Sequence, residues 1–120
     1  MRLAYLDTSY LVAILLGEPG AAALAPRLVE FDRVFSSGLL EAEVAATFTR
    51  EEIATDWGPL LSDITWVFPP ERLTAELKQV MRAGHVRGAD AWHLACALHL
   101  GLPLGSMTFL SLERRQASTA

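Results

Sequence analysis

Cysteine is scarce in this chain, which has only one, Cys96, among its 120 residues. A single cysteine excludes an internal disulfide. Cys96 stands among alanine and leucine residues, in a segment where a small buried side chain is expected. We therefore interpret Cys96 as a residue of the hydrophobic core.

The sequence also lacks a long hydrophobic run. Its longest uninterrupted apolar stretch covers residues 10–16, far short of the ~20 residues that a membrane-spanning helix needs. No charged leader precedes a cleavage-like site near the start of the chain. These absences predict a soluble, cytoplasmic protein with no membrane partner.

Basic residues are too few for a nonspecific binder of polyanions. The chain has 10 Lys and Arg against 14 Asp and Glu, for a formal net charge of −4, whereas such binders present a basic face to the phosphates. A nuclease is still compatible with this balance, because bound metal ions neutralise an enzyme's own carboxylates before they meet the phosphate.

Hydrophobic residues, in contrast, make up 52% of the chain, which is enough to fill one core and predicts a single domain over residues 1–120. Strand and helix patterns alternate along the chain, with short connections between them. This order is typical of an α/β fold with a parallel sheet covered on both faces. The predicted strands are residues 3–6, 33–36, 64–68, 102–105 and 108–111. The predicted helices are residues 10–16, 21–30 (shortened or kinked by Pro26), 38–52, 71–83 and 90–100.

Two acidic residues occupy positions where ligands gather in such folds. Asp7 directly follows the first strand, and Thr8 or Ser9 is expected to cap the helix that comes next. Asp90 stands at the beginning of the apolar helix over residues 90–100. Since open α/β sheets bind ligands at the carboxyl ends of their strands, these two carboxylates indicate a metal site.

Three blocks of sequence together carry a family resemblance. They read LAYLDTS from Leu3, SSGLLEAE from Ser36 and RGADAWHLA from Arg87. In this order and at these spacings they resemble the PIN-domain ribonucleases, in particular the VapC-type toxins of bacterial toxin–antitoxin pairs. The resemblance implies a three-layer α/β/α PIN-like fold with a short central parallel sheet.

The resemblance also implies a set of catalytic acids that bind Mg²⁺ or Mn²⁺ and cut RNA. Carried over by position, the catalytic residues are Asp7, Glu43, Asp90 and Glu113, and the first three of these hold the metal. Many family members have Asn or Asp just after a Thr in the last strand, where this chain is apolar. A variant ending in FLTLDxRQ is closer to FLSLERRQ at residues 109–116, and this likeness assigns Glu113 as the fourth acid.

Two further residues are expected to contact the substrate or the metal's surroundings. Ser9, two residues after Asp7, is placed to hydrogen-bond to the ligands of the metal. Arg87 is placed to meet a phosphate of the RNA.

The choice between two glutamates is not settled by periodicity. At 100° per residue, Glu41 and Glu43 flank the apolar stripe of the helix over residues 38–52 on opposite sides. Helical geometry leaves both open, and the register of the resemblance selects Glu43.

Each of these side chains also has an ordinary structural explanation. Asp7 and Asp90 stand where helix caps are common, and Glu43, Glu113 and Arg87 could be solvated surface charges. The two histidines of the last helix, at positions 93 and 99, are expected to pack or cap rather than bind metal, because they have no partner at ligand spacing.

The resemblance implies an endoribonuclease toxin that forms a homodimer and is neutralised by a VapB-like antitoxin. An alternative is a catalytically weakened PIN-like module that binds RNA or a protein partner without turnover. A phosphatase or other metal hydrolase is the weakest of the three, because no second Asp follows Asp7 at the short spacing of an aspartyl-phosphate site.

Overall fold

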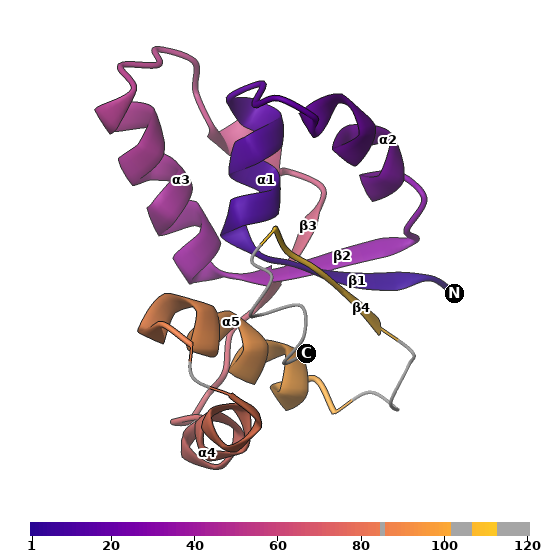
Figure 1. Cartoon of the computed structure of the whole chain (residues 1–120), viewed down its shortest axis with the longest axis vertical. Helices are drawn as coiled ribbons and strands as arrows, with labels where there is room; N and C mark the ends of the chain where they lie inside the picture. The colour runs from indigo at the N-terminus through magenta and orange to yellow at the C-terminus, as the bar shows by residue number, and fades with distance from the viewer. Residues whose placement is uncertain (85, 102–106, 113–120) are drawn as a thin grey trace.

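A parallel sheet forms the centre of the molecule (Figure 1). The computed structural model describes residues 1–84, 86–101 and 107–112, and the predicted strand at 102–105 lies outside them. Within these residues the sheet has four strands in the order β3-β2-β1-β4, all paired in parallel. They are β1 (Leu3–Leu6), β2 (Arg33–Ser37), β3 (Ile64–Val67) and β4 (Met107–Leu110).

Helices cover both faces of this sheet, which confirms the predicted three-layer α/β/α architecture. Figure 1 shows α1, α2 and α3 on one side of the strands and α4 and α5 on the other. The helices are α1 (Thr8–Leu15), α2 (Leu24–Leu28), α3 (Gly38–Arg50), α4 (Thr74–Ala83) and α5 (Gly88–His99). Two short 3-10 turns, η1 (Ala21–Ala23) and η2 (Gly58–Leu61), precede α2 and β3.

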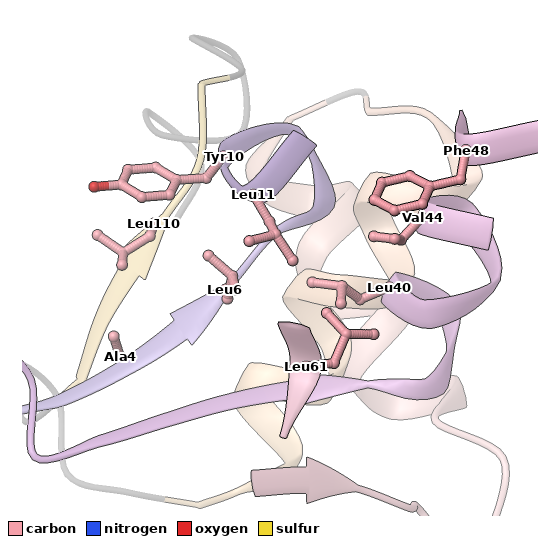
Figure 2. Close-up of a cluster of buried hydrophobic side chains, with 9 residues drawn as sticks. All are labelled: Ala4, Leu6, Tyr10, Leu11, Leu40, Val44, Phe48, Leu61 and Leu110. Atoms are coloured by element: carbon pink, nitrogen blue, oxygen red, sulfur yellow. The ribbon is translucent and has the colours of Figure 1, made fainter. Parts of the chain in front are cut away.

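The strands are rich in apolar residues because neighbouring residues point to opposite faces, and helices cover both faces. In β1, Ala4 and Leu6 pack against α1 and α3, whereas Tyr5 packs on the other face with residues of α5. The first of these two cores is drawn in Figure 2. It contains Ala4, Leu6, Tyr10, Leu11, Leu40, Val44, Phe48, Leu61 and Leu110.

The register of the strands brings their carboxyl ends to one edge. Leu6 at the end of β1 pairs with Leu110 at the end of β4, and the backbone N–H of Asp7 donates to Leu110 O at 2.9 Å. On the other side of β1, Tyr5 pairs with Phe35 of β2, two residues before that strand ends at Ser37. Residues that follow β1 and β2 therefore emerge beside one another.

Several helix boundaries differ from the predicted ones. The helix predicted at residues 10–16 begins at Thr8, because Asp7 rather than Thr8 or Ser9 caps it through a hydrogen bond from the Ser9 N–H. Apolar periodicity marks the buried part of a helix and misses a polar first turn, which also explains why α5 begins at Gly88 and not at residue 90. The helix predicted at residues 71–83 begins at Thr74.

The end of α3 has a visible cause in the backbone. The helix ends at Arg50, two residues before its predicted end. Glu52 has a φ of 55°, in the left-handed region, which an α-helix does not continue through. Among the residues that the structure describes, no helix is both long and apolar enough to cross a membrane.

Two adjacent leucines test the assignment of the core. Leu61 is 3% exposed and Leu60 is 46% exposed. We expect Leu61→Ala to lower the free energy of unfolding by about 2 to 5 kcal/mol, because it leaves a cavity in the core. The same change at Leu60 should cost less than about 1 kcal/mol. Urea unfolding followed by circular dichroism measures both, and equal losses would contradict the packing described here.

Candidate active site

Asp7 lies at the junction of β1, α1 and the end of β4. Its carboxyl group is almost completely buried, at 1% exposure. The Oδ2 atom accepts hydrogen bonds from Ser9 N at 3.2 Å, from Ser9 Oγ at 2.6 Å and from Ser111 Oγ at 3.3 Å. A buried carboxylate is tolerated only when donors of this kind replace water. Asp7 is therefore both the cap of α1 and a fixed acid at the carboxyl edge of the sheet.

Glu43 reaches the same region from α3. Its Oε1 accepts a hydrogen bond from Thr8 Oγ1 at 2.6 Å and lies 3.5 Å from His93 Nε2. The Glu43 side chain remains 36% exposed, so it is held by these contacts and is still accessible to solvent. This contact joins the second turn of α3 to the first turn of α1.

Glu41 has different surroundings. It is exposed, and its Oε2 accepts a hydrogen bond from Trp57 Nε1 at 3.0 Å. The Trp57 ring in turn packs edge to face on Phe48, with the ring centroids 6.3 Å apart. The two glutamates that helical geometry left equivalent are thus separated by their contacts, and Glu43 is the one beside Thr8.

His93 connects the two faces of the sheet at this edge. The residue is 1% exposed, with Nδ1 at 3.0 Å from Tyr5 OH and Nε2 at 3.0 Å from Thr8 Oγ1. Burial lowers the pKa of His93 below its ordinary value, although the negative charges of Asp7 and Glu43 oppose that shift. Burial of the ring therefore favours the neutral imidazole over the charged one.

Asp90 lies on α5, the helix that also bears His93. It lies in the first turn of the helix, half-buried, three residues before His93. Residues three apart on a helix are neighbours on its surface, so the contacts of His93 with Tyr5 and Thr8 bring the Asp90 side of α5 to the same edge. The positive end of the helix dipole favours a carboxylate there.

Of the remaining predicted site residues, Ser9 contacts Asp7 and Arg87 lies at the start of α5. Ser9 Oγ donates to Asp7 Oδ2 and accepts from Leu112 N at 3.1 Å. Arg87 is exposed and occupies the cap position of α5, where its carbonyl accepts from Ala91 N at 2.8 Å. Glu113, the predicted fourth acid, lies outside the described residues.

The donor set can be compared with the needs of a metal ion. No three acidic, histidine or cysteine side chains within residues 1–84, 86–101 and 107–112 are gathered closely enough to hold one. Mg²⁺, however, usually uses one or two carboxylates together with water and substrate phosphates. Asp7 and Glu43 supply such oxygen donors from neighbouring elements, and the chemistry of the set fits a hard divalent cation. His93 is buried and both of its ring nitrogens contact hydroxyl groups, which agrees with the prediction that it packs.

Three residues that contact Asp7, Glu43 or His93 were not predicted as site residues from the sequence. Thr8 was expected only as a helix cap, and no role was expected for Tyr5 or Ser111. A hydroxyl residue directly after Asp7, and a histidine three residues after Asp90 in an otherwise apolar stretch, were the available signals. The contacts themselves join residues 85 and 88 positions apart, which no local pattern reports.

Comparison with known proteins agrees with this geometry. The family model of the PIN domain matches residues 4–119. Two proteins of Mycobacterium tuberculosis are similar to the chain, ribonuclease VapC45 of strain CDC 1551 / Oshkosh and ribonuclease VapC49 of strain ATCC 25618 / H37Rv. Each is 34% identical over 119 residues, covering 86% of this chain and 80% of the relative. No solved structure gives a significant match. The chain belongs to the PIN-domain family. Its similarity within that family is to the VapC-type ribonucleases.

Asp7 is both the N-cap of α1 and an acid of the candidate site, and its role as a cap can be tested by stability measurements. Asp7→Asn keeps an oxygen that can accept the Ser9 N–H, whereas Asp7→Ala removes the cap of α1. We expect the alanine variant to be less stable than the asparagine variant by about 0.5 to 2 kcal/mol. Chemical denaturation of the two proteins measures the difference. If both variants unfold at the same denaturant concentration, the cap contributes nothing and the local geometry is not as described.

Proposed function

We propose that the chain is a metal-dependent endoribonuclease and the toxin of a type II toxin–antitoxin pair. The observation that carries the proposal is the hydrogen bond from Thr8, the residue after Asp7, to Glu43, which joins the two acid-bearing elements at one edge of the sheet. Thr8 and His93 connect the two elements that bear these acids, and Asp90 lies one turn before His93. Both similar proteins are named ribonucleases, and this agrees with the chemistry of the site.

In this proposal Asp7, Asp90 and Glu43 hold Mg²⁺ or Mn²⁺, and Glu113 completes the set as the fourth acid. When bound, the cation supplies an activated water for attack on the phosphodiester and offsets the charge of the phosphate. The residues of the chain hold and orient these groups. Asp7 is fixed by its hydrogen bonds from Ser9 and Ser111.

The open end of the site is where RNA is expected to enter. The Glu43 side chain is 36% exposed and Arg87 is exposed at the start of α5. Arg87 would meet a phosphate of the substrate, since the guanidinium group suits bidentate contacts to phosphate oxygens. Ser9, through Asp7, would order the ligands of the metal. We place this activity in the cytoplasm and assign residues 1–120 to a single PIN-like domain.

A cleavage assay with matched variants tests the activity. We expect the purified chain with Mn²⁺ to cut a pool of structured RNA such as transfer RNA, and EDTA to stop it. Asp7→Asn, Asp90→Asn and Glu43→Gln should each lower the rate about a hundredfold or more, because each removes charge that holds the cation and every ~1.4 kcal/mol of lost stabilisation is tenfold in rate.

Glu41→Gln is the control for Glu43→Gln. It is the same change two residues away on the same helix, at a side chain that contacts Trp57 instead of Thr8. Its rate should stay within about threefold of the wild type. A folded wild type that is inert on RNA with Mn²⁺ would favour the alternative of a binding module without turnover.

The partner is a separate expectation. A type II toxin is neutralised by a small VapB-like antitoxin, which we expect to be encoded beside this gene. Co-expression of the two proteins should give one complex on size exclusion, and RNA cleavage should be suppressed in it. The chain alone should elute at about twice its 13.1 kDa mass as a homodimer. Separate elution of the two proteins, with full cleavage activity, would contradict the toxin assignment.

A further inference from the structure

Four side chains form a continuous hydrogen-bonded series that passes through the sheet edge. Tyr5 OH is 3.0 Å from His93 Nδ1, and His93 Nε2 is 3.0 Å from Thr8 Oγ1. Thr8 Oγ1 is in turn 2.6 Å from Glu43 Oε1. Tyr5 is 0% exposed, His93 1% and Thr8 9%, so only the Glu43 end of the series reaches solvent.

The direction of these hydrogen bonds follows from counting protons. An ionised carboxylate only accepts, so the single hydroxyl proton of Thr8 goes to Glu43. The 2.6 Å distance is typical of a charge-assisted O–H···O⁻ bond. The Thr8 oxygen must then accept from His93 Nε2–H. A neutral imidazole has one proton, which leaves Nδ1 as the acceptor of the Tyr5 hydroxyl.

The surroundings support this assignment of protons. His93 is 1% exposed, and a ring removed from water in this way favours its neutral form. Burial also raises the pKa of Tyr5, so its hydroxyl keeps the proton that it donates. All three donors therefore point the same way, toward the carboxylate. Aligned hydrogen bonds of this kind polarise one another and strengthen the last member.

We propose that His93 is a positioning residue that acts through Thr8 to fix the carboxylate of Glu43, with Tyr5 setting its tautomer. This inference rests on the proposed ribonuclease function, because it gives Glu43 its orientation in that site. A glutamate on a helix surface has three rotatable side-chain bonds and loses much freedom when it is held. Thr8 and His93 both contact Oε1 of Glu43, and the side chain as a whole stays 36% exposed, so it remains accessible to substrate and cation.

The tautomer of His93 is a direct readout that needs neither metal nor RNA. The chain has 3 histidines, so imidazole ¹⁵N–¹H correlation spectra are simple, and a His93→Gln variant identifies the signal. We expect the neutral form of His93 to carry its proton on Nε2, because Thr8 donates its own proton to Glu43 and can only accept from the ring. A neutral ring with its proton on Nδ1 would overturn the proposed series.

Two variants of His93 separate positioning from simple packing. His93→Gln keeps an N–H donor that can reach Thr8, whereas His93→Leu fills similar space without one. We expect Mn²⁺ affinity, measured by calorimetry, and kcat for RNA cleavage each to fall about tenfold or more in the leucine variant, as is common when an outer partner of a ligand is lost. The glutamine variant should stay within about threefold of the wild type in both. Equal losses in the two variants would overturn the positioning role.

A second pair covers the case in which His93→Leu does not fold. Thr8→Ser keeps the hydroxyl that donates to Glu43, and Thr8→Val removes it at nearly constant volume. The valine variant should lose about tenfold in Mn²⁺ affinity and the serine variant little. Combining Thr8→Val with Glu43→Gln should add almost nothing to the loss of Glu43→Gln alone, since both act on one contact. Additive losses would contradict the series.

These readouts distinguish the two levels of the proposal. If the wild type binds Mn²⁺ and shows the expected tautomer but does not cut RNA, the ribonuclease function fails and the series stands. If the wild type cuts RNA and His93→Leu cuts it equally well, the positioning role fails and the ribonuclease function stands.

Discussion

Three buried polar residues, Asp7, Thr8 and His93, find their hydrogen-bond partners at the edge of the sheet, because helices cover both of its faces. The strands β1 and β2 carry apolar side chains on each side, and the polar residues Asp7 and Thr8 come directly after β1 ends. A carboxylate there is stable only if hydrogen bonds replace its water. Hydroxyl groups of Ser9 and Ser111 supply these hydrogen bonds to Asp7. Thr8 and His93 are also buried and need partners, and their hydrogen bonds join α1 to α3 and α5.

This constraint links the stability of the fold to its chemistry. Asp7 caps α1 and Asp90 lies in the first turn of α5, so both carboxylates lie at the positive ends of helices. The arrangement concentrates negative charge on a chain that is already acidic, with a formal net charge of −4. In the proposed function, a hard divalent cation would remove the resulting repulsion and give the site its affinity for phosphate. Since one fold can serve many functions, this local chemistry has to carry the functional assignment.

The sequence predicted the architecture well because the architecture depends on local patterns. Short apolar runs, glycine and proline breaks, and the acid after β1 were enough to place the parallel sheet, the helices and Asp7. Helical periodicity could not decide which of Glu41 and Glu43 belongs to the site. The difference between them depends on Trp57, which lies in a loop that folds back onto α3 and binds Glu41. The contacts of His93 also depend on the tertiary fold, because its partners Tyr5 and Thr8 lie at the other end of the chain. Positions 102–106 and 113–120, which include Glu113, lie outside the described residues.

The central claim is that acids far apart in the sequence, Asp7, Glu43 and Asp90, share one divalent cation. The most direct measurement is diffraction from crystals soaked in Mn²⁺, recorded at the manganese absorption edge. We expect an anomalous difference peak within coordination distance of the Asp7 and Asp90 carboxylates, with Glu43 at the same ion directly or through water. A protein that is saturated with Mn²⁺ and shows no peak at Asp7, or whose Asp7 and Asp90 carboxyl groups point to separate places, would contradict this account.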